Sequence, residues 1–125
     1  FFGYAYYAEN QARLKALPIV AKAGKAGVLP SEATVLDGTY QPLSRPIFVY
    51  VNVKSLARPE VREFAEYMMN SAAQIAKEVK YVPLPARAYA IGLDHLARGK
   101  KGTVFGGKNE VGVRIEELLA REAKL

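Results

Sequence analysis

The chain has 125 residues and a mass of 13.7 kDa, the size of one domain or of a large piece of a bigger one. Half of its residues are hydrophobic and 24% are charged, which excludes a disordered tail, a collagen-like repeat and a coiled-coil rod. With no cysteine and one histidine, His95, the composition also excludes disulfide scaffolds, thiol nucleophiles and histidine-rich metal clusters. We therefore expect neither a metal nor a cofactor.

The net charge of +6 suits an anionic partner in a general way. The charge is scattered, and the one dense basic cluster, residues 98–101, is too short for a nucleic-acid-binding stripe. No apolar run reaches the ~18–20 residues of a transmembrane helix. The chain opens at Phe1 without an initiator Met, a basic leader or a cleavage pattern, which is typical of a mature product or a fragment.

Pattern and turn residues predict the elements of the first part of the chain. Pro18 favours an extended run over a helix, and Ser31 can cap the free amides of one helical turn at 30–34. The expected elements are a short strand within residues 1–10 running into a helix over 7–15, a strand over 17–20, a surface loop over 21–29 and a turn at 37–38.

The strongest predicted strand is Ile47–Val51, which follows Pro42 and Pro46. Its residues are β-branched and aromatic at consecutive positions, so both faces are apolar. This pattern is typical of a strand buried on both sides in a parallel-type sheet.

The remainder is predicted to be mainly helical. Pro59 suits a first helical turn, the prolines at 83 and 85 prevent helix before residue 85, and Gly99 can end the following helix. The expected elements are a helix from residue 55 or 56, a second helix starting at 70–71, an extended stretch over 81–85, a helix from 85 to 99, a flexible segment over 102–107 and a last helix over about 111–124. The overall prediction is a mixed α/β chain with more helix than strand.

Most chemical signals have simpler explanations. Residues 24–27 and 106–108 lack the full spacing of a phosphate loop, so solvated loops are the better interpretation. His95 has no second ligand at metal-binding spacing, which favours a surface or packing role. The glutamates at 60, 63, 66, 116 and 117 are not placed as facing catalytic pairs, and we predict no catalytic residue.

Ser44 and Arg45 leave two interpretations open. They lie in a turn between two prolines, just before the predicted buried strand, where a hydroxyl and a guanidinium could meet an anion. An arginine at such a junction can equally tie a loop to backbone carbonyl groups.

Three segments carry a family resemblance when taken in order. They are Phe2-Gly3-Tyr4-Ala5-Tyr6-Tyr7, then the run from Tyr40 to Val51 (YQPLSRPIFVYV), then Val79-Lys80-Tyr81-Val82-Pro83-Leu84-Pro85. This series resembles the C-terminal part of the periplasmic phosphate-binding protein of phosphate ABC transporters. Residues 102–107 and the last helix resemble the tail of one bacterial branch of that family.

The resemblance implies an α/β, class II periplasmic-binding-protein fold of which this chain is the C-terminal portion, with an incomplete sheet and several flanking helices. Residues 1–15 would end the second lobe, residues 16–42 would form the hinge and crossover region, and residues 43–125 would complete the first lobe. Sheet edges and an apolar helix face should then remain uncovered.

The resemblance also implies a non-enzymatic receptor that closes two lobes over inorganic phosphate and delivers it to a membrane permease. Most ligand groups would lie in upstream loops, so the N-terminal part of the same protein is an expected partner. Tyr4, Ser44 and Arg45 are the candidate ligand-binding residues at the hinge side of the cleft. The location would be periplasmic or otherwise extracytoplasmic, with any lipid anchor in an upstream segment, and no nucleic acid would bind.

Three alternatives remain. One is a receptor or sensor for another oxyanion, such as sulfate or molybdate, on the same fold. The second is a small basic α/β module that binds nucleic acid. The third, a hydrolytic enzyme, has the least support because no ordered nucleophile motif is present.

Overall fold

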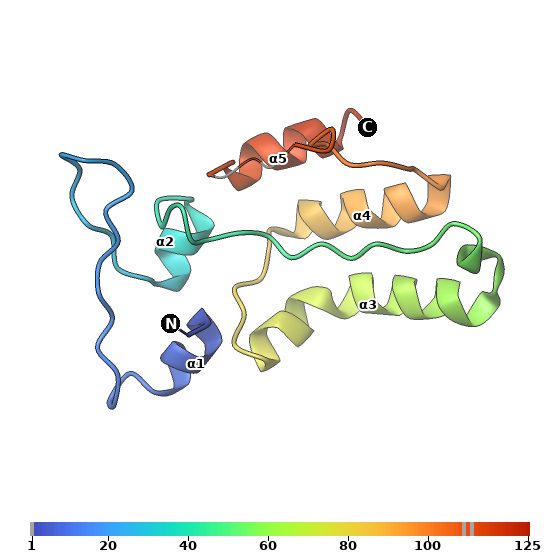
Figure 1. Cartoon of the computed structure of the whole chain (residues 1–125). Helices are drawn as coiled ribbons and strands as arrows, with labels where there is room; N and C mark the ends of the chain where they lie inside the picture. The colour runs from blue at the N-terminus through green and yellow to red at the C-terminus, as the bar shows by residue number, and fades with distance from the viewer. Residues whose placement is uncertain (1, 109, 111) are drawn as a thin grey trace.

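The computed structural model describes residues 2–108, 110 and 112–125, and the regular elements within them are helices joined by long irregular segments (Figure 1). The helices are α1 (Tyr4–Glu9), α2 (Glu32–Leu36), the 3-10 turn η1 (Ser55–Ala57), α3 (Pro59–Glu78), α4 (Ala86–Arg98) and α5 (Ile115–Glu122). Phe1 and Val111, which belong to the predicted first strand and last helix, lie outside the described residues.

The three longest helices form the packed part of the molecule. Helix α3 contacts η1 and α4, and α4 contacts α5. The buried side chains are few: Leu56 in η1, Ala65 in α3 and Leu118 in α5. The core therefore lies between these helices and is small for a chain of this length.

The N-terminal prediction was wrong in its details. Instead of a strand followed by a helix over 7–15, residues 4–9 form α1. The helix ends where the Asn10 side-chain amide donates to the Tyr6 carbonyl oxygen at 2.9 Å, because a short amide side chain competes for the backbone acceptors of a last turn.

The strand predicted over 17–20 is reduced to one bridge. Ile19 and Val28 exchange both backbone hydrogen bonds, each with an N···O distance of 2.9 Å. The residues between them form the predicted surface loop. A single bridged pair is too short to make a strand of a sheet.

The predicted turn at 30–34 is confirmed as α2. The Ser31 hydroxyl accepts from the Thr34 backbone N–H at 3.0 Å, and the Thr34 hydroxyl accepts from the Ser31 N–H at 2.9 Å. This reciprocal capping satisfies two amides that would otherwise lack partners. Gly38, with φ +73°, follows in the predicted turn.

The predicted buried strand Ile47–Val51 differs most from the structure. The segment is extended, but no ladder is present in the described part of the chain, so the expected sheet is not seen. Ile47 is 69% exposed and Tyr50 is 74% exposed. A strand needs a neighbour to satisfy its backbone, and the described residues provide none at that place.

The second helical prediction is partly right. Pro59 is the first residue of α3, and Gly99, with φ +61°, ends α4 as expected. The break predicted at Asn70-Ser71 is absent because α3 continues to Glu78. An unbroken helix keeps the side chains at 65, 69, 72 and 76 on one face, and α3 packs against α4.

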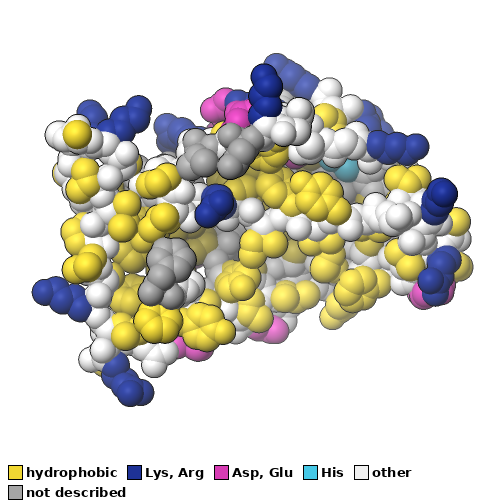
Figure 2. Space-filling model, in the orientation of Figure 1, with side chains coloured by type: hydrophobic (Ala, Val, Ile, Leu, Met, Phe, Trp, Pro, Cys, Tyr) yellow, Lys and Arg dark blue, Asp and Glu magenta, His cyan; other side chains and the backbone are white. Residues whose placement is uncertain are grey.

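Large hydrophobic side chains remain exposed, including an apolar helix face of the kind that the sequence predicted to stay uncovered. Figure 2 shows them gathered across the middle of the visible face, with lysines and arginines mainly around its margins. Phe64 and Tyr67 on α3 are each 65% exposed. A contiguous apolar surface of this kind is typical of a surface that another element covers.

Candidate functional site

Ser44 lies in a turn that its neighbours hold in place. The Ser44 backbone N–H donates to the Tyr40 carbonyl oxygen at 3.2 Å, and the Gln41 side-chain amide donates to the Ser44 hydroxyl oxygen at 3.1 Å. Ser44 is half-buried. Because its hydroxyl oxygen accepts this bond, the hydroxyl hydrogen is left to donate to another group, and an anion is a suitable acceptor.

Gln41 is a polar residue of this turn that the sequence analysis did not single out. Its Oε1 atom is buried and has no hydrogen-bond partner within the described residues. The backbone of Gly112, far along the chain, lies against the same side chain. Gln41 therefore orients Ser44 through its amide nitrogen. A lone glutamine next to a proline gives no sequence signal for such a role.

Arg45 is exposed beside Ser44. Within the part of the chain that the structure describes, its guanidinium forms no ion pair and no hydrogen bond to a backbone carbonyl oxygen. The loop-tying interpretation of Arg45 therefore has no bond to support it here. The five N–H donors of the planar Arg45 guanidinium are suited to binding a tetrahedral oxyanion.

Tyr4 has no hydrogen bond or aromatic contact with Ser44 or Arg45 among the described residues. It is half-buried on α1, where its ring meets that of Tyr7 with centroids 6.3 Å apart and planes tilted by 50°. No hydrogen bond within the described residues joins Tyr4 to Ser44 or Arg45. A common site for the three residues stays a prediction.

The turn after α2 carries a carboxylate that accepts two hydrogen bonds from one neighbour. Asp37 Oδ1 accepts from the Thr39 hydroxyl at 2.6 Å and from the Thr39 backbone N–H at 2.8 Å. These two bonds lower the pKa of Asp37, desolvation opposes them, and the charge of Arg114 lowers the pKa to the smallest degree. Asp37 is thus held as an anion in a turn that lies only a few residues before Ser44.

Arg114 connects this turn to the C-terminal helix. Its guanidinium donates to the Asp37 backbone carbonyl oxygen at 3.2 Å, and its side chain lies against Gly38. The two residues are 77 positions apart, so no local pattern could predict the contact.

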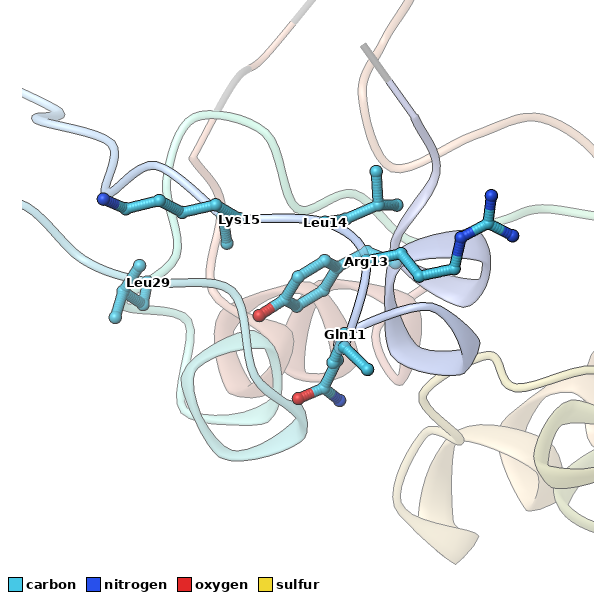
Figure 3. A pocket seen from close by; sticks show the side chains of 8 residues that line it. Gln11, Arg13, Leu14, Lys15 and Leu29 are labelled. Atoms are coloured by element: carbon cyan, nitrogen blue, oxygen red, sulfur yellow. The ribbon is translucent and has the colours of Figure 1, made fainter.

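Figure 3 shows an open depression of about 510 Å³ beside α1, which includes Gln11 and Leu29. Its two cations, Arg13 and Lys15, extend in opposite directions in this view. Charges that diverge cannot hold one small anion together. The depression is therefore a weak candidate for a binding site.

The remaining signals have structural roles. Glu60 pairs with Arg58 at 2.6 Å, and Glu117 pairs with Arg121 at 2.6 Å. The bond from Arg58 also helps to lower the pKa of Glu60, after the larger effect of the Glu60 backbone N–H. Exposed pairs of this kind contribute little to stability. No group of three or more acidic or histidine side chains placed to bind a metal occurs among the described residues.

The loops that faintly resembled phosphate loops do not precede helices in the required way. Residues 104–107 form a turn, and Gly106 and Gly107 have φ values of +55° and +77°. Among the described helices, none has the length and apolar character that crossing a bilayer requires.

The chain is similar to known proteins over most of its length. It is 47% identical over 122 residues to protein SphX of Synechococcus elongatus and 44% identical over 124 residues to protein SphX of Synechocystis. It is also 38% identical over 97 residues to the phosphate-binding protein PstS of Staphylococcus aureus. These matches cover 98%, 98% and 77% of this chain. No protein-family model matches the chain.

The chain is also similar to a protein of known structure. The possible phosphate-binding protein of Planctomyces limnophilus superposes with a TM-score of 0.64 at 40% identity, covering 80% of this chain and 36% of that protein. The chain spans about a third of the length of the relatives it matches, since the covered shares are 36%, 36% and 29%. The resemblance to phosphate-binding proteins that the sequence predicted is confirmed.

Proposed function

We propose that this chain is the C-terminal portion of a solute receptor that binds inorganic phosphate between two lobes and delivers it to an ABC transporter permease. The observation that carries the proposal is the 38% identity to a phosphate-binding protein, together with the match to a solved possible phosphate-binding protein at a TM-score of 0.64. Receptors of this kind bind and release their ligand unchanged, so the chain has no catalytic role and needs no metal or cofactor.

The proposed lobes follow the domain boundaries expected from the sequence. Residues 1–15 end the second lobe, residues 16–42 form the hinge and crossover, and residues 43–125 belong to the first lobe of a class II binding-protein fold. The packing of η1, α3, α4 and α5 on one another supports the last of these units. Lobe closure is favoured by contacts with phosphate that only the closed state makes.

Ser44 and Arg45 are the proposed phosphate-facing residues of this portion. The Gln41 amide orients the Ser44 hydroxyl, and the exposed Arg45 guanidinium is adjacent to it. Together they present hydrogen-bond donors and a positive charge to a tetrahedral anion. Tyr4 contributes from the second lobe only when the lobes close. Most other ligand groups come from the N-terminal part of the protein.

The N-terminal part is also the proposed cover for the apolar surfaces. Ile47–Val51 is extended and its residues 47–50 are exposed, which leaves the segment available to a strand that the described residues do not supply. Phe64 and Tyr67 of α3 present an apolar face in the same way. The proposed location is periplasmic or otherwise extracytoplasmic, where any lipid anchor would be carried by an upstream segment.

Calorimetric titration of phosphate and then of sulfate tests the proposal. The intact polypeptide that carries these residues should bind phosphate and ignore sulfate, whereas residues 1–125 by themselves should bind neither anion. Binding of sulfate alone would assign the other oxyanion, and an intact polypeptide that ignores phosphate would contradict the proposed function.

Two variants test the assigned residues. Arg45→Ala and Ser44→Ala should each weaken phosphate binding about tenfold or more, because each removes a hydrogen bond to a charged group, which contributes about 1.5–3 kcal/mol. Arg13→Ala removes an exposed cation of the open depression and is the matched control. Equal effects of Arg45→Ala and Arg13→Ala would mean that only general charge matters.

A further inference from the structure

Two contacts bring the chain that precedes α5 against the segment that carries Ser44. The Phe105 ring meets the Phe48 ring edge-on, with centroids 5.6 Å apart and planes at 88°. A Cβ on Gly112 would stand 3.7 Å from Oε1 of Gln41, so the Gly112 backbone lies against the end of that side chain. Residues that precede α5 therefore contact the chain both before and after Ser44.

Arg114, the N-cap residue of α5, makes a third contact of this kind. Its guanidinium donates to the Asp37 carbonyl oxygen at 3.2 Å, and its side chain lies against Gly38. Figure 1 shows the start of α5 beside the turn that follows α2. As the contacting residue advances from 105 through 112 to 114, its partner recedes from 48 through 41 to 38 and 37. The two segments therefore run antiparallel, in nearly constant register.

We call Phe105, Gly112 and Arg114 the tail strap. It is fastened to the packed helices on its other side, where Arg121 of α5 donates to Glu110 at 2.8 Å. These two side chains are only about one-third exposed, at 33% and 34%. Helix α5 itself contacts α4. The tail strap thus connects the packed part of the molecule to a turn that has no core of its own.

Gln41 is the residue at which the tail strap reaches the candidate site. Its amide nitrogen donates to the Ser44 hydroxyl oxygen at 3.1 Å, and its buried Oε1 is the atom that lies against Gly112. The amide is planar, so neither end can turn without moving the other. The backbone at Gly112 therefore restricts the direction from which Ser44 receives its bond, and the Ser44 hydrogen stays free to donate elsewhere.

We propose that the tail strap positions the Ser44–Arg45 turn for phosphate, and that Gln41 is the positioning residue through which it acts. The inference rests on the proposed function, which makes this turn face phosphate. A hydroxyl whose direction is fixed before the anion arrives loses less freedom on binding, so this arrangement increases affinity. Gln41 and the tail strap contribute without touching the anion.

Phosphate titration of the intact polypeptide that carries these residues tests the role of Gln41. Gln41→Met keeps the length of the side chain and removes its amide, and should weaken phosphate binding about three- to tenfold. In a Ser44→Ala background the same change should have little further effect. Gln74→Met is the matched control, because the Gln74 amide donates to Glu78 at 2.9 Å on the surface of α3. Equal weakening by Gln41→Met in both backgrounds would overturn the positioning role.

The Ser44 backbone amide, which donates to the Tyr40 carbonyl oxygen at 3.2 Å, reports on the tail strap without any ligand. Arg114→Met should increase hydrogen exchange of this amide about threefold or more and weaken phosphate binding about two- to fivefold. Arg58→Met is the control, because Arg58 pairs with the exposed Glu60 at 2.6 Å and should change neither quantity. Unchanged exchange of the α4 amides shows that each variant is folded.

The two readouts separate the possible failures. If Arg114→Met leaves both the Ser44 amide and phosphate binding unchanged, the tail strap does not hold the turn and the inference is wrong. A wild-type polypeptide that does not bind phosphate contradicts the proposed function, and with it the role of the turn in phosphate binding. The Ser44 amide still decides in that case whether the tail strap holds the turn.

Discussion

The two parts of this chain are held together in different ways. From residue 55 onward, helices pack on one another and bury Leu56, Ala65 and Leu118. Before residue 54, order comes mainly from bonds between near neighbours, such as the Ser31–Thr34 capping pair and the Ile19–Val28 bridge. Local capping can therefore position a turn without a core, whereas an extended segment needs a partner strand to satisfy its backbone hydrogen bonds.

Removing Leu118 should produce the largest effect, because it breaks the packed part of the molecule. Leu118 lies on α5 and is only 5% exposed. Leu118→Ala should lower the free energy of unfolding by about 2–4 kcal/mol through lost burial and a residual cavity. Denaturant unfolding measures this loss. Leu17→Ala is the control, since Leu17 is 71% exposed and should change stability by less than about 0.5 kcal/mol.

Gly99 tests a local signal inside the packed part. Its φ of +61° at the end of α4 is unfavourable for an L residue, although a Cβ there would meet no neighbour. Gly99→Ala should therefore cost about 1 kcal/mol of unfolding free energy, all of it from the backbone. Gly3→Ala is the control, because Gly3 has a φ of −65°. If thermal melts show equal changes for the two variants, the left-handed conformation at Gly99 is not what ends α4.

Ser31 tests the corresponding signal in the region without a core. Ser31→Ala removes the acceptor of the Thr34 amide and should reduce the stability of α2 by about 1 kcal/mol. Hydrogen exchange of the α2 amides should then increase several-fold while α4 stays unchanged. Ser55→Ala is the matched control, since the Ser55 hydroxyl makes no hydrogen bond within the described residues. Simultaneous loss of α4 protection would show that the two parts unfold as one.

The smallest effect should come from Asp37, where the two parts meet. The bonds from Thr39 lower the pKa of this carboxyl below its ordinary value of 3.8. A lowered folded-state pKa contributes stability that is present above the ordinary value and is lost as pH falls through the folded value. The hydrogen-exchange protection of the α2 amides should fall with pH in the wild type. In Asp37→Asn, the dependence of this protection on pH should be flatter below about pH 4. An unchanged profile in Asp37→Asn would contradict the assignment.

Local signals in the sequence predicted much of the helical structure. The cap at Ser31, the proline at residue 59 and the stop at Gly99 act within one turn, so each is readable without knowledge of the rest of the fold. The predicted break at Asn70-Ser71 failed because packing against α4 favours a continuous helix. The predicted strand Ile47–Val51 has the right composition but lacks a partner.

The candidate site was predictable only in part. Ser44 and Arg45 stand out because two prolines enclose their turn, and the structure adds the Gln41 bond that orients the serine. The contacts of Arg114 with Asp37 and of His95 with Glu122 join residues 77 and 27 positions apart. Such contacts depend on how the helices pack, which local patterns do not encode.

Hydrogen exchange of the Ile47–Val51 amides tests the central claim most directly. These amides should exchange almost freely in residues 1–125 alone and become as protected as those of α4 in the intact, longer polypeptide, because a neighbouring strand then satisfies the backbone. Phe64 and Tyr67 should become inaccessible to a surface label at the same time. Strong protection of 47–51 in the isolated chain, or none in the longer polypeptide, would contradict the account of this chain as one portion of a larger receptor.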